Sequence, residues 1–468
     1  MQFDSAFFLF CFLPVLVVLH LILRPRRVRN GLLLLAGLVF YAFSGLSALA
    51  VLAALTLVTY GFGLLLMSLR HKKPVLAAAL VVQLGLLAGY KYLDFFLGSL
   101  LPVFHGSWTG LGLAVPAGLS FFTFKCVSYV IDVYRQPPAG TKNPLKLLLY
   151  VSFFPQLLAG PITRFRDFAE QLEDRQPQLE DLTLGLRRFI LGLGKKVFLA
   201  AAAGAVADPI FALDRGGLNA PLAWLGAACY TLQIFFDFSG YSDMAIGLGR
   251  MFGFHTPENF NYPYVVDTIS QFWRRWHISL SGWFRDYVYI PLGGNRKGRY
   301  RAALNKLIVF ALCGLWHGAA WTFVLWGLWH GLWSGLESLG SNTLDRLRRH
   351  PVGRGLMRVY TLLVVLLGFV LFRADTITGG LTLLGAMIGL GGGRGALITL
   401  HTVLTLPRVL LLLSAVVLCT PVIPRLSRGR ENSAGWQTLC YGGCFVLLVL
   451  CIAQIAAGEF TPFIYFQF

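Results

Sequence analysis

Long apolar runs recur from one end of the chain to the other, and they constrain its fold more than any other feature. Hydrophobic residues make up 56% of the 468 residues and charged residues only 13%, about half the charged fraction of a typical soluble domain. Apolar runs of about 20 residues are typical of membrane-spanning helices. We therefore expect an all-α, multi-pass membrane protein without a sizeable soluble domain. Its first run, residues 7–23, reads as a membrane helix rather than a cleavable signal.

The distribution of charge indicates how the chain crosses the membrane. Lys and Arg total 40 against 21 Asp and Glu, which gives a net charge of +19. In a soluble protein this excess would suggest nucleic acid, but here the basic residues gather in short loops between apolar runs. That is the positive-inside pattern, so we place these loops in the cytoplasm and expect membrane lipids, not nucleic acid, around the chain. The basic loops are residues 24–29, 70–73, 135–146, 164–196, 296–306, 346–354 and 425–430.

This pattern predicts about a dozen spans, with both ends of the chain outside. Several are shorter than the roughly 20 residues that a spanning helix needs, which predicts broken or tilted helices among them. The candidate spans are residues 6–23, 31–45, 48–67, 74–96, 113–134, 184–212, 220–249, 303–318, 320–338, 356–373, 401–423 and 436–457.

Two segments do not fit simple spans. Residues 147–165 are apolar but broken by Pro155, Gly160 and Pro161, which predicts a re-entrant segment held inside protein or beside a water-filled cavity. Residues 270–294 mix charges with aromatics at helical spacing. This second segment is either an interfacial amphipathic helix or a helix that dips toward a polar cavity. Its aromatics are Phe272, Trp276, Trp283 and Tyr287.

Polar side chains at membrane depth cost several kcal/mol when unsatisfied, so each is a candidate for function. One cluster, Asp237, Ser239, Tyr241 and Asp243, lies near the end of an apolar span. It is either an interfacial cap bonded to neighbouring helices or a wall of the active cavity that orients a catalytic base.

Three histidines form the other candidate cluster, and each follows a tryptophan. His277 lies in "RRWHISLS", and His317 and His330 lie in two copies of Trp-His-Gly. Histidine is well suited to proton transfer near neutral pH, although structural hydrogen bonding is the alternative for each. Three tryptophan-flanked copies favour a reaction site, to which Trp276 and Trp316 would contribute.

The spacing of the repeated motif bears on which histidine works. His317 and His330 are 13 residues apart, which on one continuous helix is about 20 Å along the axis and about 220° around it. They can approach only if the chain turns near residues 318–320. Even after such a turn His330 would lie lower on the second arm, so we predict one working histidine, His317 next to the turn, and a structural one, His330.

Cysteines add little to this picture. The eight cysteines lie in or beside apolar runs without CxxC pairs, so we expect neither a disulfide framework nor a metal site. Cys313 precedes His317 by one helical turn, and a Cys–His pair would permit catalysis through a thioester. A packed small residue is the simpler interpretation of Cys313.

Four motifs together resemble the membrane-bound O-acyltransferase (MBOAT) superfamily. They are "NFNYPYVVDTISQFWRRWHISLSGWFRDYVYIPLGGNRKG" (259–298), "LWHGAAWTFVLWGLWHG" (315–331), "FFPQLLAGPITRF" (153–165) and "IFFDFSGYSDMAIGLGRMFGF" (234–254). The resemblance is strongest to the bacterial branch that contains the alginate O-acetyltransferase membrane subunit. Residues 115–337 carry most of it.

The resemblance implies a fold and an activity. It implies one membrane domain over residues 1–468, with a core of about a dozen helices and re-entrant or interfacial helices around a tunnel, and with peripheral helices at 1–110 and 355–468. An acyl donor enters from the cytoplasm, and an acceptor hydroxyl takes the group at or beyond the other face. His317 corresponds to the superfamily histidine and His277 to the second family position. Periplasmic acetyltransferase or acceptor proteins, a polysaccharide acceptor and the bacterial inner membrane are also implied.

These lines of reasoning give a mechanism with named residues. His317 is the general base, and His277 polarises the thioester carbonyl or orients the acceptor. Burial disfavours a charged imidazole and so keeps His317 able to accept a proton. We expect the donor to be acetyl-CoA, with no further cofactor. Arg296, Lys297 and Arg299 bind its phosphates, helped by backbone N–H groups of the neighbouring glycines 293, 294 and 298, unless this loop serves topology alone.

Three alternatives stay open at this point. The D-alanyl transfer protein of teichoic acid shares these motifs but takes its acyl group from a carrier protein. A transporter would also have broken helices and membrane histidines, but it predicts inverted repeats, and we find none. A scaffold of a polysaccharide export complex would leave the histidines without a purpose.

Overall fold

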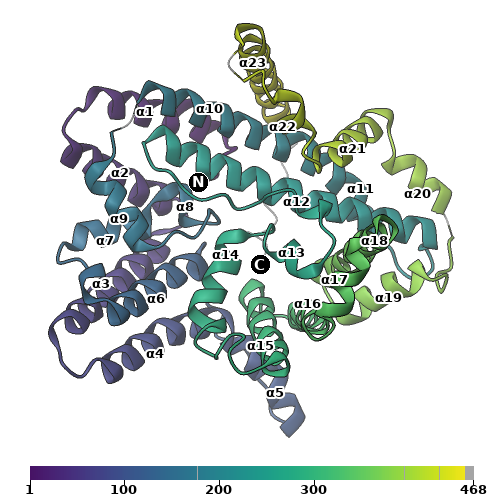
Figure 1. Ribbon diagram of the computed structural model, residues 1–468, viewed down its shortest axis with the longest axis horizontal. Helices are drawn as coiled ribbons and strands as arrows, with labels where there is room; N and C mark the ends of the chain where they lie inside the picture. Colours follow the sequence, from purple (N-terminus) through teal and green to yellow (C-terminus); the bar gives the residue numbers. More distant parts are fainter. Residues whose placement is uncertain (177, 395, 432, 459–468) are drawn as a thin grey trace. The chain divides into compact units, whose positions relative to one another are not determined.

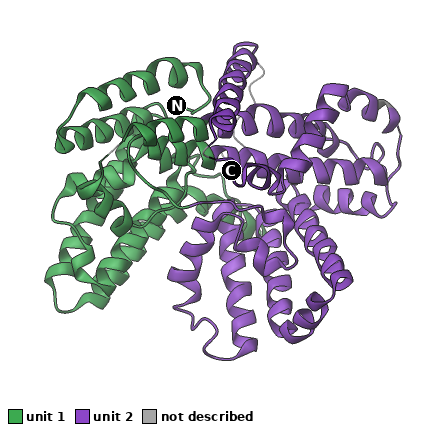
Figure 2. Cartoon of the chain, turned by 45° about the horizontal axis from the view of Figure 1, so that its top comes forward, with its two compact units in different colours: residues 1–189, 242–257 green, residues 190–241, 258–468 purple. Residues whose placement is uncertain are grey.

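The computed structural model describes residues 1–176, 178–394, 396–431 and 433–458, and these residues form helices joined by turns and loops (Figure 1). This confirms the all-α prediction. The chain divides into two compact units, shown in separate colours in Figure 2. Unit 1 comprises residues 1–189 and 242–257, and unit 2 comprises residues 190–241 and 258–468.

Unit 1 consists of the N-terminal helices, most of α10 (Leu179–Gly194) and the end of α12 (Ala220–Met251). Its remaining elements are η1 (Phe8–Phe12), α1 (Leu13–Ile22), α2 (Arg26–Ala42), α3 (Leu46–Ser68), α4 (Lys72–Lys91), α5 (Leu93–Leu100), η2 (Leu101–Phe104), α6 (Leu119–Arg135), η3 (Pro137–Ala139), α7 (Pro144–Ser152), α8 (Phe154–Leu157) and α9 (Phe165–Asp174).

The segment predicted to be re-entrant is broken as expected. Helix α7 ends at Ser152, the short α8 follows, and residues 158–164 are not helical. The break is buried within unit 1, where Phe153 packs against Phe168 and Phe254 with ring centroids 5.2 and 4.7 Å apart. Irregular backbone of this kind is tolerated at membrane depth only inside protein. Its position in the membrane stays a prediction.

Unit 2 contains the rest of α10 and α12 and all of the C-terminal helices. These are η4 (Lys195–Ala200), α11 (Ala201–Phe211), η5 (Pro263–Val265), α13 (Ile269–Trp273), α14 (Ile278–Phe284), η6 (Arg285–Tyr289), α15 (Arg299–His317), α16 (Trp321–Leu339), α17 (Ser341–Arg349), α18 (Pro351–Arg373), α19 (Ile377–Met387), α20 (Ala396–Val403), α21 (Leu406–Leu418), α22 (Val422–Ser427) and α23 (Ala434–Ala456).

Five of the described helical segments are long and apolar enough to cross a membrane, so the predicted dozen is not confirmed. The single span predicted at 401–423 is wrong, because this stretch is divided among α20, α21 and α22, and Pro407 and Pro421 lie at the two breaks. The five segments are Leu46–Ser68, Lys72–Lys91, Leu179–Phe211, Pro351–Arg373 and Ala434–Ala456.

The prediction of one amphipathic or dipping helix over residues 270–294 is also wrong. Helix α13 ends at Trp273, the chain turns through residues 274–277, and α14 begins at Ile278. The π-helical turn η6 then ends the segment. Trp276, Trp283 and Tyr287 are buried rather than spread over a membrane surface. The helical spacing of these aromatic residues therefore reflects packing inside unit 2, not a membrane-surface helix.

Helices α15 and α16 form a hairpin that turns at residues 318–320, between the predicted spans 303–318 and 320–338. The two helices lie backbone against backbone at two glycines. A Cβ atom added to Gly314 would lie 2.2 Å from the Phe323 carbonyl oxygen, and one added to Gly327 would lie 2.2 Å from that of Phe310. Small residues permit this approach between membrane helices. Each glycine precedes a motif histidine by three residues, so the crossing helps to fix where both histidines lie.

Candidate active site

The hairpin brings both motif histidines against one aromatic side chain. His317 is the last residue of α15, and His330 lies in the middle of α16. The Trp326 ring centroid is 5.0 Å from that of His317 and 5.2 Å from that of His330. His317 also contacts Trp316, with centroids 5.0 Å apart. The two histidines thus share a tryptophan neighbour, as the predicted turn allows.

His277 reaches the same neighbourhood from an unusual backbone conformation. It precedes α14 with φ 44° and ψ 55°, in the left-handed region that non-glycine residues seldom adopt. Such a conformation costs about 1–3 kcal/mol and persists only where surrounding contacts impose it. Two backbone hydrogen bonds do so here, from Ile278 N to Asn259 O (2.9 Å) and from Asn261 N to Arg275 O (3.0 Å).

A buried carboxylate on the hairpin anchors the helix that leads to His277. Glu337 of α16 accepts hydrogen bonds from Ile269 N (2.6 Å) and Ser270 N (2.9 Å), at the start of α13. The Thr268 hydroxyl caps the same helix by accepting from Gln271 N at 3.1 Å. A negative charge is favoured at a helix N-terminus, because unpaired N–H groups point outward there. Helices α13 and α16 are therefore held together on the side that carries the histidines.

The His277 side chain is buried among uncharged neighbours. Its Nδ1 atom lies 3.2 Å from Asn259 Oδ1, and its ring meets Phe238 edge-on with centroids 4.6 Å apart. The Trp316 ring lies at 6.2 Å. Because Trp316 also contacts His317, the structure brings both predicted catalytic histidines to one tryptophan. We call His277, Trp316, His317, Trp326 and His330 the histidine cluster.

Trp276 supports this cluster without forming part of it. It is buried, and its ring packs against those of Phe272, Phe260 and Phe369, with centroids 5.4, 5.1 and 5.2 Å apart. The side chain thereby fixes the turn that precedes His277.

His330 is enclosed differently from the other two histidines. It is fully buried, and neither ring nitrogen has a hydrogen-bond partner among the residues that the structure describes. Trp273 covers one side, with centroids 5.0 Å apart. A Cβ added to Gly368 of α18 would lie 2.5 Å from His330 Nε2. This tight aromatic enclosure favours the packing role predicted for His330.

We expect Gly368→Ala to destabilise the protein by about 1–3 kcal/mol, the usual cost of overpacking a core. The added methyl group would overlap the His330 ring, which Trp273 and Trp326 keep from moving away. Thermal unfolding in detergent would measure the loss. Gly355→Ala on the same helix is the control, because open space surrounds its Cβ position. Equal melting temperatures for the two variants would contradict the enclosure.

Two of the polar residues of α12 form ion pairs, each within its own unit. Asp237, in unit 2, forms a buried ion pair with Lys196 at 2.8 Å. Asp243, in unit 1, pairs with Arg188 at 2.8 Å. A buried carboxylate (Asp237) and a partly buried one (Asp243), each with a cationic partner, agree with the interfacial-cap interpretation. Ser239 and Tyr241 are also buried, and the supporting role of all four residues stays a prediction.

The basic loop predicted to bind the donor is exposed between η6 and α15. Arg296, Lys297 and Arg299 all lie at the surface, and Gly293, Gly294 and Gly298 adopt positive φ angles. The expectation that backbone N–H groups of this loop meet a phosphate is corrected at two glycines. Gly293 N donates to Ile290 O (3.0 Å) and Gly294 N to Tyr289 O (2.9 Å), so the turn itself uses both. Phosphate binding would therefore rest on the cationic side chains.

Three contact residues of the cluster were not singled out from the sequence. Asn259 and Phe238 touch His277, and Trp326 touches both motif histidines. Asn259 and Trp326 lie within motifs that were quoted for the resemblance, and Phe238 lies between two flagged polar residues. A polar side chain in an aromatic-rich motif was the available signal for Asn259.

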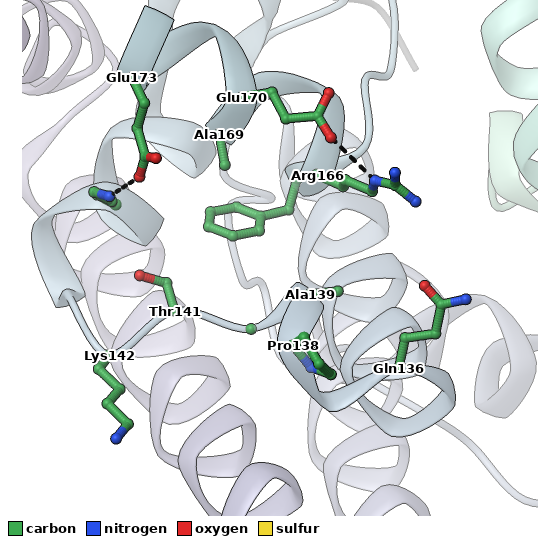
Figure 3. A pocket seen from close by; sticks show the side chains of 12 residues that line it. Gln136, Pro138, Ala139, Thr141, Lys142, Arg166, Ala169, Glu170 and Glu173 are labelled. Atoms are coloured by element: carbon green, nitrogen blue, oxygen red, sulfur yellow. Dashed lines mark hydrogen bonds and ion pairs between the residues drawn. The ribbon is translucent and has the colours of Figure 1, made fainter.

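Unit 1 carries two surface cavities, and none of the residues discussed above is among those that line them. One of about 540 Å³ is shown in Figure 3, where Lys146 pairs with Glu173 and Arg166 with Glu170. The other, of about 800 Å³, lies beside it and includes Arg26, Arg27 and Lys146. The ion pairs drawn in Figure 3 neutralise much of the first cavity's charge, and we assign it no chemistry.

Comparison with known proteins identifies the family to which this chain belongs. A model of the MBOAT, membrane-bound O-acyltransferase family matches residues 37–377, and the chain belongs to this family. It is therefore a multi-pass membrane protein and an O-acyltransferase.

Individual relatives within the family differ in how much of this chain they match. The chain is 39% identical to the probable alginate O-acetylase AlgI of Pseudomonas putida, with all of both chains covered. It is 35% identical to the peptidoglycan O-acetyltransferase of Helicobacter pylori, over 83% of this chain and 80% of the relative. The teichoic acid D-alanyltransferase of Bacillus subtilis is 30% identical over 51% of this chain and 65% of the relative. The two acetyl-transferring relatives thus match far more of the chain than the D-alanyl one.

Proposed function

We propose that this chain transfers an acetyl group from acetyl-CoA, on the cytoplasmic side of the bacterial inner membrane, to an exopolysaccharide such as alginate. The observation that carries the proposal is the burial of two histidines, His277 and His317, against the same tryptophan in a member of an O-acyltransferase family. The extent of the match to relatives named as O-acetylases supports acetyl as the group that moves.

In the proposed reaction His317 is the general base. It takes the proton of the acceptor hydroxyl while the hydroxyl oxygen attacks the thioester carbonyl carbon. The carbon–sulfur bond then breaks, the acetyl ester remains on the acceptor, and the CoA thiolate leaves and is protonated. Aromatic rings of Trp316, Trp326 and Phe372 pack around His317.

His277 takes part from the turn before α14. Two roles follow from its chemistry: a ring N–H can polarise the thioester carbonyl, and a bare ring nitrogen can hold a substrate hydrogen. The acceptor hydroxyl belongs either to the polysaccharide itself or to a periplasmic protein that passes the acetyl group on. With either acceptor, the names of the alginate O-acetylase relatives support a role in acetylating an exopolysaccharide.

The proposed donor site is the basic loop after η6. Replacing Arg296, Lys297 and Arg299 together by glutamine is expected to raise the KM for acetyl-CoA about tenfold or more, because one hydrogen bond to a charged phosphate contributes about 1.5–3 kcal/mol. The measurement is the initial rate of CoA release at increasing acetyl-CoA.

The matched control removes an equal number of positive charges from another basic segment. Arg425, Arg428 and Arg430, which are all exposed, are replaced with glutamine. An unchanged KM in the first triple variant would leave membrane topology as the function of the 296–299 loop. A rise in both triple variants would assign the effect to net charge.

The proposed donor is tested with purified wild-type protein in liposomes. One set receives acetyl-labelled CoA and the other a carrier protein loaded with labelled D-alanine, each with alginate oligosaccharides as acceptor. We expect label to leave CoA and to stay on the carrier. Release from the carrier alone would replace acetyl transfer by the D-alanyl alternative.

A further inference from the structure

The second nitrogen of His277 is a buried atom whose role neither the fold nor the family membership defines. The side chain is 1% exposed, and Nε2 has no hydrogen-bond partner among the described residues. A buried polar atom without a partner costs about 1–3 kcal/mol, so its retention needs an explanation. A substrate group that fills the position is one such explanation.

The Asn259 atom that lies opposite His277 Nδ1 can be identified as oxygen or nitrogen from its other hydrogen bonds. Asn259 Oδ1 lies 3.2 Å from the backbone N–H of Ser279 and 2.9 Å from the Ser279 hydroxyl. A backbone N–H can only donate, so the Asn259 atom that receives it must be the amide oxygen. The orientation of the Asn259 amide is thereby fixed independently of His277.

An amide oxygen can only accept, and this determines the tautomer of His277. For the 3.2 Å contact to be a hydrogen bond, His277 Nδ1 must carry the proton. The ring contacts the uncharged side chains of Phe238, Trp316 and Asn259, and burial lowers the pKa of His277 to about 3. A neutral imidazole carries one proton, so the proton on Nδ1 leaves Nε2 bare.

We propose that Asn259 is a positioning residue that locks His277 in the Nδ1–H tautomer, so that Nε2 accepts a hydrogen from a substrate O–H or N–H. This selects between the two roles open to His277, because a bare nitrogen cannot donate to a thioester carbonyl. The polarising role is thereby excluded for the neutral ring.

Two substrate groups have the required chemistry, a hydroxyl of the acceptor and an amide N–H of the pantetheine arm of acetyl-CoA. The identity of these substrates rests on the proposed function, whereas the tautomer does not. With His317 as the base for the attacking hydroxyl, Nε2 of His277 would hold a second donor and so fix the orientation of one substrate.

The tautomer is tested first, without any assay of activity. Protein labelled with ¹³C and ¹⁵N histidine is compared with His277→Gln by solid-state NMR, and the difference isolates the signals of His277. Nδ1 is bonded to Cγ and Nε2 is not, which tells the two nitrogens apart. We expect a protonated Nδ1 and a bare Nε2 in the wild type. A proton on Nε2 would overturn the proposal.

The positioning role is tested with two substitutions of similar size. Asn259→Leu removes the acceptor, and we expect transfer to fall about tenfold at every pH, the cost of one lost buried hydrogen bond of about 1–1.5 kcal/mol. Asn259→Asp keeps the acceptor but adds a negative charge that raises the pKa of His277. The His277 ring then becomes protonated at a higher pH. The fall of kcat/KM on the acid side of the pH profile should therefore begin at a higher pH, while activity at alkaline pH is retained.

The control and the possible outcomes separate this inference from the proposed function. Gln83→Leu removes a different buried amide, which donates to Thr59 at 3.0 Å, and should leave the pH profile unchanged. The positioning role would be wrong if both Asn259 variants lost the same fraction of activity and the fall of kcat/KM at acid pH stayed where it is in the wild type. A higher KM for alginate oligosaccharides in Asn259→Leu assigns the hydrogen to the acceptor, and a higher KM for acetyl-CoA assigns it to the donor. A wild type inactive with acetyl-CoA would defeat the proposed function while the NMR result still decides the tautomer.

Discussion

Replacement of His317 by glutamine is expected to lower acetyl transfer by about 10²- to 10⁴-fold, the usual contribution of a general base. Glutamine approximates the volume of the imidazole and retains polar atoms, but it cannot accept a proton near neutral pH. The packing of His317 against Trp326 and Phe372, with centroids 5.0 and 5.2 Å apart, should therefore survive. The measurement is CoA release per folded molecule in liposomes, with folding checked by size exclusion.

The same experiment distinguishes the two histidines of the repeated motif. His330→Gln is expected to show the opposite pattern, with a lower melting temperature and a much smaller loss of turnover per folded molecule. The reason is that His330 is enclosed by Trp273, Trp326 and the glycine at 368, without a ring nitrogen that reaches a partner in the described chain. Normal turnover in His317→Gln would show that the base lies elsewhere, with His277 as the next candidate.

Sequence patterns predicted those parts of this fold that depend on neighbouring residues. Apolar runs marked most helices to within a few residues, for example α16 at 321–339 against a predicted 320–338. The small residues at 318–320 marked the turn of the hairpin, because they were the most probable break between two apolar runs. The prolines at 155 and 161 marked the broken segment: Pro155 lies just after the break at residue 153, and Pro161 lies in the non-helical residues 158–164.

Contacts between distant residues were not predictable in the same way. The aromatics of 270–294 fit a continuous helix. Histidine is one of the few non-glycine residues enriched in the left-handed region, but it adopts that region too seldom to indicate a turn at 274–277. That turn depends on backbone hydrogen bonds to residues 259 and 261.

The same limit applies to the candidate site. His277 and His317 were identified by residue type and by resemblance, but their common neighbour Trp316 became apparent only in three dimensions. Asp237 was flagged as a buried polar residue, whereas its partner Lys196 lies 41 residues away and was read as part of a basic loop. The sequence thus indicated which residues carry chemistry and left open which of them meet.

The largest effect on folding is expected from alanine at Gly327. Its Cβ would lie 2.2 Å from the Phe310 carbonyl oxygen and 3.2 Å from the Gly314 Cα. Real Cβ atoms do not approach backbone this closely, so α15 and α16 would have to separate. Overpacking of a core usually costs about 1–3 kcal/mol, and a clash with backbone belongs at or above the upper end, because no rotamer change relieves it. Gly314→Ala meets the Phe323 carbonyl oxygen in the same way and should behave alike.

Gly335→Ala is the matched control on the same helix. Its Cβ would lie 3.5 Å from that of Ala303 on α15, an ordinary contact, and alanine suits a helix better than glycine by about 0.5–1 kcal/mol. We expect melting temperatures in detergent to fall for Gly314→Ala and Gly327→Ala and to be unchanged or higher for Gly335→Ala. Equal melting for all three would mean that the hairpin is not packed at these glycines. Because each glycine lies one helical turn before a motif histidine, any folded Gly314→Ala protein should also turn over more slowly, with His317 displaced from Trp326.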